Sequence, residues 1–310
     1  MAGGGDSTRA IFFALGANFA IAVAKGVAAF FTGSSAMLAE TVHSLADCGN
    51  QGLLLLGVKQ SKRPATPEYP LGYGKAIYFW SFLVALMLFT VGGMFSLYEG
   101  IHKLQVHEAV DTGKLWWAVG VLVFGIVVEG ISMRACMQEV NKSRAGRSLW
   151  RWFRESRQAE LVVIFGEDLA ALLGLVFALV AVCLTMITGN PLWDALGTIA
   201  IGALLIIVAV FVAIEVKALL IGQSVDPQRQ QQIRQFLDGR PEVAATISVL
   251  TLQMGNDVMV SVQAHMRERD NVQQLIREIN AVEVAMKQAF PEIRWSFFEP
   301  EQNGGMASPP

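Results

Sequence analysis

The chain has 310 residues and a formal net charge of −2; 53% of its residues are hydrophobic and only 16% are charged. A soluble domain of this size normally carries about 25% charged residues, so the composition excludes an ordinary soluble protein. The near-neutral charge gives no reason to expect a nucleic-acid partner. Long apolar runs end at Ile221. This shift predicts a membrane domain over residues 1–222, a soluble domain over 223–300 and a disordered tail over 301–310.

Six stretches reach the roughly 20 mainly apolar residues that a membrane-spanning helix needs. They lie at Thr8–Phe31, Ala36–Gln60, Ile77–His102, Leu115–Val140, Leu161–Ile187 and Leu192–Ile221. Basic residues gather between the second and third stretches and between the fourth and fifth. The positive-inside rule places these connections, and therefore both termini, in the cytoplasm. No transit-like segment precedes the first stretch, so we expect the inner (plasma) membrane of a prokaryote.

The second stretch carries polar residues, which are costly inside a membrane. Glu40, His43, Asp47 and Asn50 are spaced i, i+3, i+7, i+10. That spacing places the four side chains within about an 80° sector of one helix face. His43 and Asp47 are a full turn apart, so both can reach the same ion.

Two further stretches carry carboxylates: Glu129 lies near the centre of 115–140, and Glu167 and Asp168 lie in 161–187. Adjacent helical positions differ by about 100°, so we expect only one of Glu167 and Asp168 to point at a given site. A lone polar residue could simply hydrogen-bond a neighbouring helix. Several anions from three helices would repel each other unless a cation lies among them. The pattern therefore predicts a metal or proton site, and imidazole with carboxylates suits zinc without excluding Mn, Fe, Co or Cd.

The soluble part predicts a small α+β domain. Asp226-Pro227 begins a helix that runs to about Leu237. Strands are expected over Val243–Gln253 and Val258–Ala264, a helix over Val272–Phe290, and a last strand over Ile293–Phe298. The order αββαβ is typical of a ferredoxin-like layer, for which we expect a role in assembly.

Three segments resemble the cation diffusion facilitator family of divalent metal transporters. Residues 32–51, with the sequence TGSSAMLAETVHSLADCGNQ, are similar to the family's turn between helices 1 and 2 and to its helix 2 metal motif. His43 and Asp47 match the two ligand positions of that motif. LGYGKA at 71–76 and FGEDLAALLG at 165–174 are similar to its segments before helix 3 and in helix 5. The resemblance covers nearly the whole chain. It implies a homodimer joined by its cytoplasmic domains, and proton-coupled export by alternating access.

The helix 5 segment departs from the usual family pattern. Asp168 matches the second ligand position, but Ile164 stands at the first and cannot bind metal. The chain resembles the branch that includes the animal mitochondrial zinc transporter 9, which shares the Glu-Asp pair. The candidates for the fourth ligand, in order, are Glu167, Glu129, Asn50 and water.

The sequence therefore predicts an α-helical membrane protein with six transmembrane helices and a C-terminal ferredoxin-like cytoplasmic dimerisation domain. Its expected function is proton-coupled export of a divalent ion, with zinc the leading candidate and no cofactor beyond the transported ion and H⁺. Three alternatives stay open. A membrane enzyme is one, although no HExxH spacing is present; a passive channel is the second; a metal sensor or assembly protein with little transport is the third.

Overall fold

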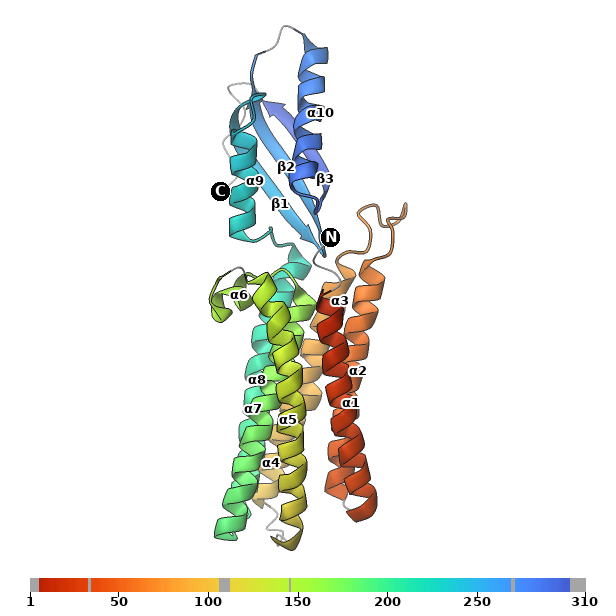
Figure 1. Ribbon diagram of the computed structural model, residues 1–310, viewed down its shortest axis with the longest axis vertical. Helices are drawn as coiled ribbons and strands as arrows, with labels where there is room; N and C mark the ends of the chain where they lie inside the picture. The colour runs from red at the N-terminus through yellow and green to blue at the C-terminus, as the bar shows by residue number, and fades with distance from the viewer. Residues whose placement is uncertain (1–5, 33–34, 106–111, 145, 269–270, 302–310) are drawn as a thin grey trace.

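The computed structural model of the protein describes residues 6–32, 35–105, 112–144, 146–268 and 271–301. Side chains are described throughout these ranges except at 6–9, 28–29, 31–32, 35–43, 46 and 112–114. The expected tail beyond Glu301 lies outside the described residues. A helical bundle and a smaller α/β unit are stacked along the long axis of the molecule (Figure 1).

The bundle contains long helices joined at alternate ends. Its elements are α1 (Asp6–Thr32), α2 (Ser35–Ser61), α3 (Ala76–Met87), η1 (Leu88–Met94), α4 (Phe95–Gln105), α5 (Thr112–Ser143), α6 (Leu149–Glu155), α7 (Ala159–Thr188) and α8 (Leu192–Ile221). α3, the π-helical segment η1 and α4 follow one another directly and form a single span over Ala76–Gln105. The short helix α6 was not expected from the sequence.

Within the described residues, five helical spans are long and apolar enough to cross a membrane. They lie at Ala10–Val27, Ala76–Gln105, Leu115–Ser143, Ala159–Thr188 and Leu192–Ile221. The protein is therefore an integral membrane protein with helical spans, as expected. α2 has 27 residues and lies in the same bundle. It carries the polar residues described above, and its crossing as a sixth span stays a prediction.

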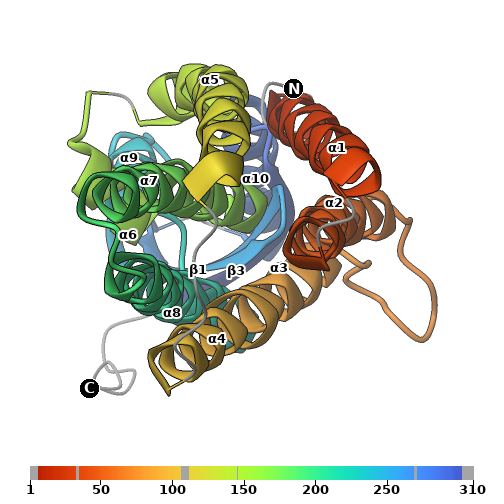
Figure 2. The same cartoon turned by 90° about the horizontal axis from the view of Figure 1, so that it is seen from below.

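The spans form a closed arrangement when seen along the bundle (Figure 2). α1 packs against α2 and α5, and α7 packs against α5 and α8. The α3–α4 span closes the arrangement because it contacts both α2 and α8. α4 and α8 approach closely: a Cβ added at Gly202 would lie 2.7 Å from the backbone nitrogen of Leu97. Small residues at such crossings allow membrane helices to pack through their backbones.

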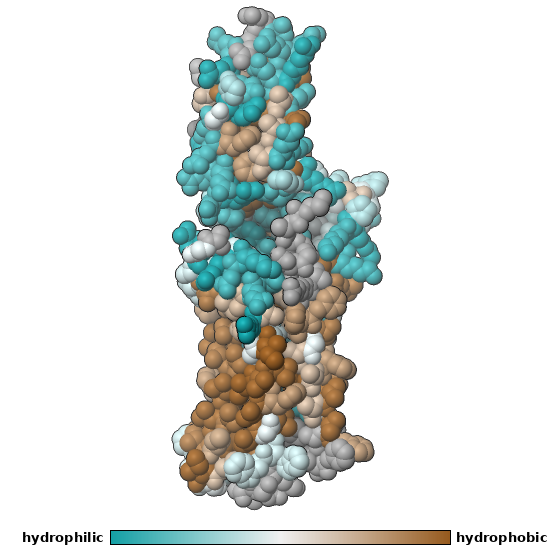
Figure 3. Space-filling view, viewed as in Figure 1, coloured by the Kyte–Doolittle hydropathy of each residue, from teal (hydrophilic) through white to brown (hydrophobic). Residues whose placement is uncertain are grey.

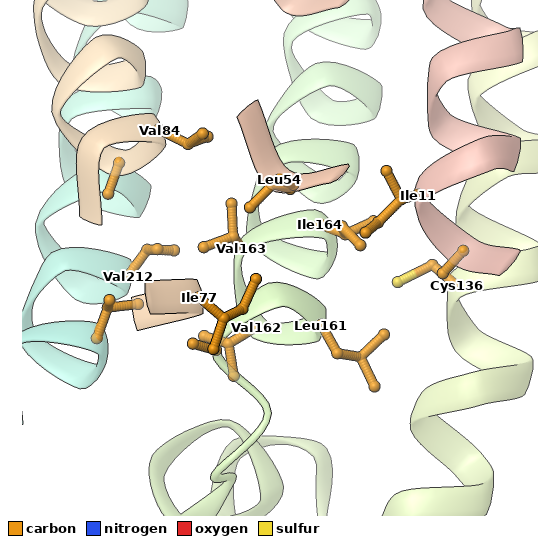
Figure 4. Close-up of a cluster of buried hydrophobic side chains, with 14 of the residues drawn as sticks. Ile11, Leu54, Ile77, Val84, Cys136, Leu161, Val162, Val163, Ile164 and Val212 are labelled. Atoms are coloured by element: carbon orange, nitrogen blue, oxygen red, sulfur yellow. The ribbon is translucent and has the colours of Figure 1, made fainter. Parts of the chain in front are cut away.

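A cluster of buried apolar side chains holds the helices together (Figure 4). Leu161 and Ile164 on α7, Leu54 on α2 and Ile11 on α1 are at most 1% exposed. The cluster fixes the position of α7 immediately before its Glu-Asp pair.

The outer surface of the bundle is strongly apolar (Figure 3). Large side chains such as Phe19, Val127, Ile131 and Ile207 are more than half exposed. Hydrocarbon chains of a bilayer would cover such side chains without cost.

The α/β unit comprises α9 (Pro227–Asp238), β1 (Val243–Met254), β2 (Asp257–Met266), α10 (Val272–Ala289) and β3 (Ile293–Glu301), the predicted αββαβ order. The sheet order is β1-β2-β3, with β1 antiparallel and β3 parallel to the central strand β2. Val260, Val262 and Ala264 alternate along β2 and are fully buried. They pack with Val282 and Met286 of α10. The expected fold class, a helical membrane domain followed by a small C-terminal α+β unit, is confirmed, and the number of six spans stays a prediction.

Candidate metal-binding site

The Glu-Asp pair of α7 lies inside the bundle. Glu167 is 6% exposed and Asp168 is 2% exposed. Adjacent positions on a helix point about 100° apart, and the two side chains accordingly contact different helices. Glu167 faces α2, and Asp168 faces α5. The pair therefore connects α7 to two neighbours at once.

Glu167 is bound by two amides of α2. Gln51 Nε2 donates to Glu167 Oε2 at 2.7 Å, and Asn50 Nδ2 donates to Glu167 Oε1 at 3.4 Å. In the part of the chain that the structure describes, the side-chain oxygens of Asn50 and Gln51 have no hydrogen-bond partner. A buried oxygen without a donor is costly, and a cation would satisfy it.

Asp168 is bound from α5. Ser132 Oγ donates to Asp168 Oδ2 at 3.1 Å. Glu129 precedes Ser132 by three residues, so both lie on the same face of α5. Glu129 is 3% exposed, and its charge interacts with those of Asp168 and Asp47. Two buried carboxylates from different helices thus interact electrostatically.

Asp47 on α2 completes the group of carboxylates. It precedes Asn50 and Gln51 by about one turn, is partly buried, and interacts electrostatically with Glu167 and Glu129. Carboxylates from three helices therefore interact electrostatically within an otherwise apolar bundle.

The side chains of His43 and Glu40 lie outside the described residues, although both positions belong to α2. Among the described side chains, no three His, Cys, Asp or Glu lie close enough together to bind one metal ion. The ligand set that includes His43 therefore stays a prediction.

Three further polar residues of this region were missed in the sequence. Gln51 and Ser132 hydrogen-bond the pair on α7. Lys25 on α1 is 9% exposed, and its charge interacts electrostatically with Glu129. A charged residue within an apolar segment is a signal in its own right, and Lys25 could have been found by it. Gln51 follows Asn50 directly, and Ser132 lies one helical turn from Glu129, so helix geometry could have indicated both.

Residues 11–221 match the family model of the cation efflux transmembrane domain. The human mitochondrial proton-coupled zinc antiporter SLC30A9 is 34% identical over 233 residues, which cover 74% of this chain and 41% of that protein. Metal tolerance protein C4 of Arabidopsis thaliana is 31% identical over 233 residues, covering 74% of this chain and 50% of that protein. The chain thus spans half or less of the length of these two relatives.

A third relative matches over nearly its full length. The magnetosome protein MamB of Magnetospirillum gryphiswaldense is 23% identical over 286 residues, which cover 92% of this chain and 90% of that protein. The family model matches more than half of the chain, which establishes the family. The protein is therefore a member of the cation efflux (cation diffusion facilitator) family, whose members are metal-ion transporters rather than enzymes.

Proposed function

We propose that the protein exports a divalent transition-metal ion, zinc first of all, in exchange for protons. The observation that carries this proposal is a set of interacting carboxylates inside an apolar bundle, buried on α5 and α7 and partly buried on α2. Such groups are costly in a membrane unless they bind cations. The name of the human relative, a proton-coupled zinc antiporter, supports zinc and protons as the exchanged ions.

The proposed ligands are His43, Asp47 and Asp168. Glu167 is the first candidate for a fourth ligand, since its side chain extends from α7 to the polar stretch of α2 and accepts hydrogen bonds there. Glu129 and Asn50 follow, and the free Asn50 Oδ1 is a suitable oxygen donor for a cation. One imidazole with carboxylates fits zinc coordination.

Proton coupling follows from the chemistry of these ligands. Metal binding needs a neutral imidazole and ionised carboxylates, so metal and protons compete for the same groups. Helices that rock about the site would expose it to each side in turn. Protonation of the ligands when the site faces away from the cytoplasm then favours release of the metal. Their deprotonation when the site faces the cytoplasm favours metal binding.

We place both termini and the α/β unit in the cytoplasm. The start of α1, the end of α8 and the connection that contains α6 all lie at the end of the bundle nearest the α/β unit (Figure 1). This end also carries the basic residues Lys62, Arg63, Arg144, Arg147 and Arg151, which favour the cytoplasmic side. We further propose that two copies assemble through their α/β units.

The proposal is tested by zinc binding and zinc uptake in proteoliposomes with the variant Asp168→Asn. Asparagine keeps the shape and one acceptor oxygen for Ser132 but removes the charge, so we expect both binding and uptake to be lost. Asp194→Asn is the matched control because Asp194 is a partly exposed carboxylate at the start of α8, paired with Lys103 at 3.0 Å. Wild-type uptake by Asp168→Asn would disprove the site. Zinc binding by the wild type without any uptake would instead indicate a sensor or assembly protein.

A further inference from the structure

A lysine lies inside the bundle, where an uncompensated charge is costly. Lys25 on α1 is 9% exposed. Its ammonium donates a hydrogen bond of 3.1 Å to Ser44 Oγ on α2. Ser44 is 4% exposed and precedes Asp47 by about one helical turn. Lys25 therefore lies on the side of α1 that faces the polar stretch of α2.

The charge of Lys25 also reaches the carboxylates. Glu129 on α5 interacts electrostatically with Lys25 as well as with Asp168 and Asp47. α1 packs against both α2 and α5, and a lysine side chain is long enough to place its ammonium between such neighbours. Lys25 thus adds one positive charge that acts on Glu129, whose own charge interacts with Asp168 and Asp47.

The hydrogen bond to Ser44 does not by itself require a charge, since a neutral amide could donate it equally well. A charge has consequences that an amide lacks. It offsets part of the repulsion among the carboxylates, and it repels any other cation that approaches them. A divalent ion must therefore bind against the field of Lys25.

We propose that Lys25 is a built-in counter-cation of the metal site. It neutralises part of the carboxylate charge when no metal is bound, and it lowers the affinity for metal by like-charge repulsion. This inference rests on the proposed transport function, because a carrier must release its ion as well as bind it. A site made only of anions and imidazole would hold zinc more tightly and turn over more slowly.

The test measures zinc and cadmium affinity of the purified full-length protein in detergent by isothermal titration calorimetry at one pH. Lys25→Gln keeps a donor for Ser44 without the charge, Lys25→Met removes both, and Lys25→Arg keeps the charge. Lys59→Met is the control, because Lys59 is exposed in the last turn of α2. Initial rates of zinc uptake into proteoliposomes are measured for the same set.

We expect Lys25→Gln and Lys25→Met to bind zinc about tenfold more tightly or better, and to transport it more slowly at saturation. Lys25→Arg and Lys59→Met should stay within about twofold of the wild type. If Lys25→Met does not fold, Lys25→Gln decides the question. Unchanged or weaker zinc binding by Lys25→Gln overturns the inference and leaves the proposed function intact. A wild type that binds no metal overturns both.

Discussion

The hydroxyl of Tyr78 on α3 is hydrogen-bonded to Gly255 in the turn between β1 and β2. Gly255 N donates to Tyr78 Oη at 2.9 Å, and Tyr78 Oη lies 3.5 Å from the carbonyl oxygen of Gly255. Tyr78 is fully buried. In the connection between α6 and α7, Arg157 Nε donates to the carbonyl oxygen of Ser224 at 2.6 Å. Hydrogen bonds therefore connect the α/β unit and the segment before it to the start of α3 and to the segment that precedes α7.

The variant Tyr78→Phe should weaken this junction. It removes the only side-chain oxygen that Gly255 N–H contacts among the described residues, and a buried donor left without an acceptor costs about 1–3 kcal/mol. Thermal unfolding in detergent should show the loss, and amide hydrogen exchange should increase at Gly255. Tyr98→Phe is the control, because Tyr98 is 66% exposed on α4. Equal protection of Gly255 in both variants would contradict the assignment.

The variant Gly74→Ala tests the same junction sterically. A Cβ at Gly74 would overlap the carbonyl oxygen of Met254, which is backbone and cannot move aside by a change of rotamer. We expect displacement of the β1–β2 turn and a loss of stability of about 1–3 kcal/mol. Gly130→Ala should be neutral or mildly stabilising, since a Cβ there meets nothing within 4 Å. The two variants are compared by thermal unfolding. An unchanged melting temperature for Gly74→Ala would show that Gly74 does not contact the β1–β2 turn.

The variant Glu167→Gln separates the charge of this residue from its hydrogen bonds. Glutamine keeps an oxygen that can accept from Gln51, so the contact between α2 and α7 should survive. Loss of one negative charge beside the proposed ligands should weaken zinc binding about tenfold or more. Calorimetric titration measures the change, with Glu99→Gln as the control because Glu99 is a partly exposed partner of Lys103. Wild-type zinc affinity in Glu167→Gln would remove Glu167 from the list of candidate ligands.

The ion pair between Arg229 and Glu292 in the α/β unit predicts a pH dependence. Burial alone would raise the pKa of Glu292, but the hydrogen bond from Arg229 Nε at 2.5 Å and the charge of Arg229 outweigh it and lower that pKa. A lowered pKa means that the pair stabilises the fold above the ordinary carboxyl pKa of about 4.3, and that this stabilisation is lost as the pH falls through the lower folded value.

Glu292→Gln should accordingly be less stable than the wild type by about 1 kcal/mol or less at neutral pH. The difference should shrink as the pH falls below about 4. Chemical unfolding of the full chain in detergent, followed at several pH values, measures it. A difference that grows on acidification would show that the pair is not ionised in the folded protein.

The sequence predicted the elements well where local rules decide. The apolar residues that alternate along β2 are buried, namely Val258, Val260, Val262 and Ala264. Asp226 caps α9 by accepting a hydrogen bond from Arg229 N at 3.1 Å. The Glu-Asp pair was recognised as costly in a membrane, but its partners on α2 and α5 depend on how the helices pack. Single-helix periodicity cannot show which neighbour each side chain faces. The junction at Tyr78 joins residues 177 positions apart, and no local signal marks it.

The most direct test of the central claim is zinc flux into proteoliposomes of the purified wild type, with and without an imposed pH gradient. Asp47→Ala is the control for the site, and manganese, iron(II), cobalt and cadmium are compared with zinc. We predict saturable zinc uptake that follows the pH gradient and is lost in Asp47→Ala, although the variant still folds. Zinc flux that ignores the pH gradient, or that persists in Asp47→Ala, would contradict proton-coupled export through this group of carboxylates.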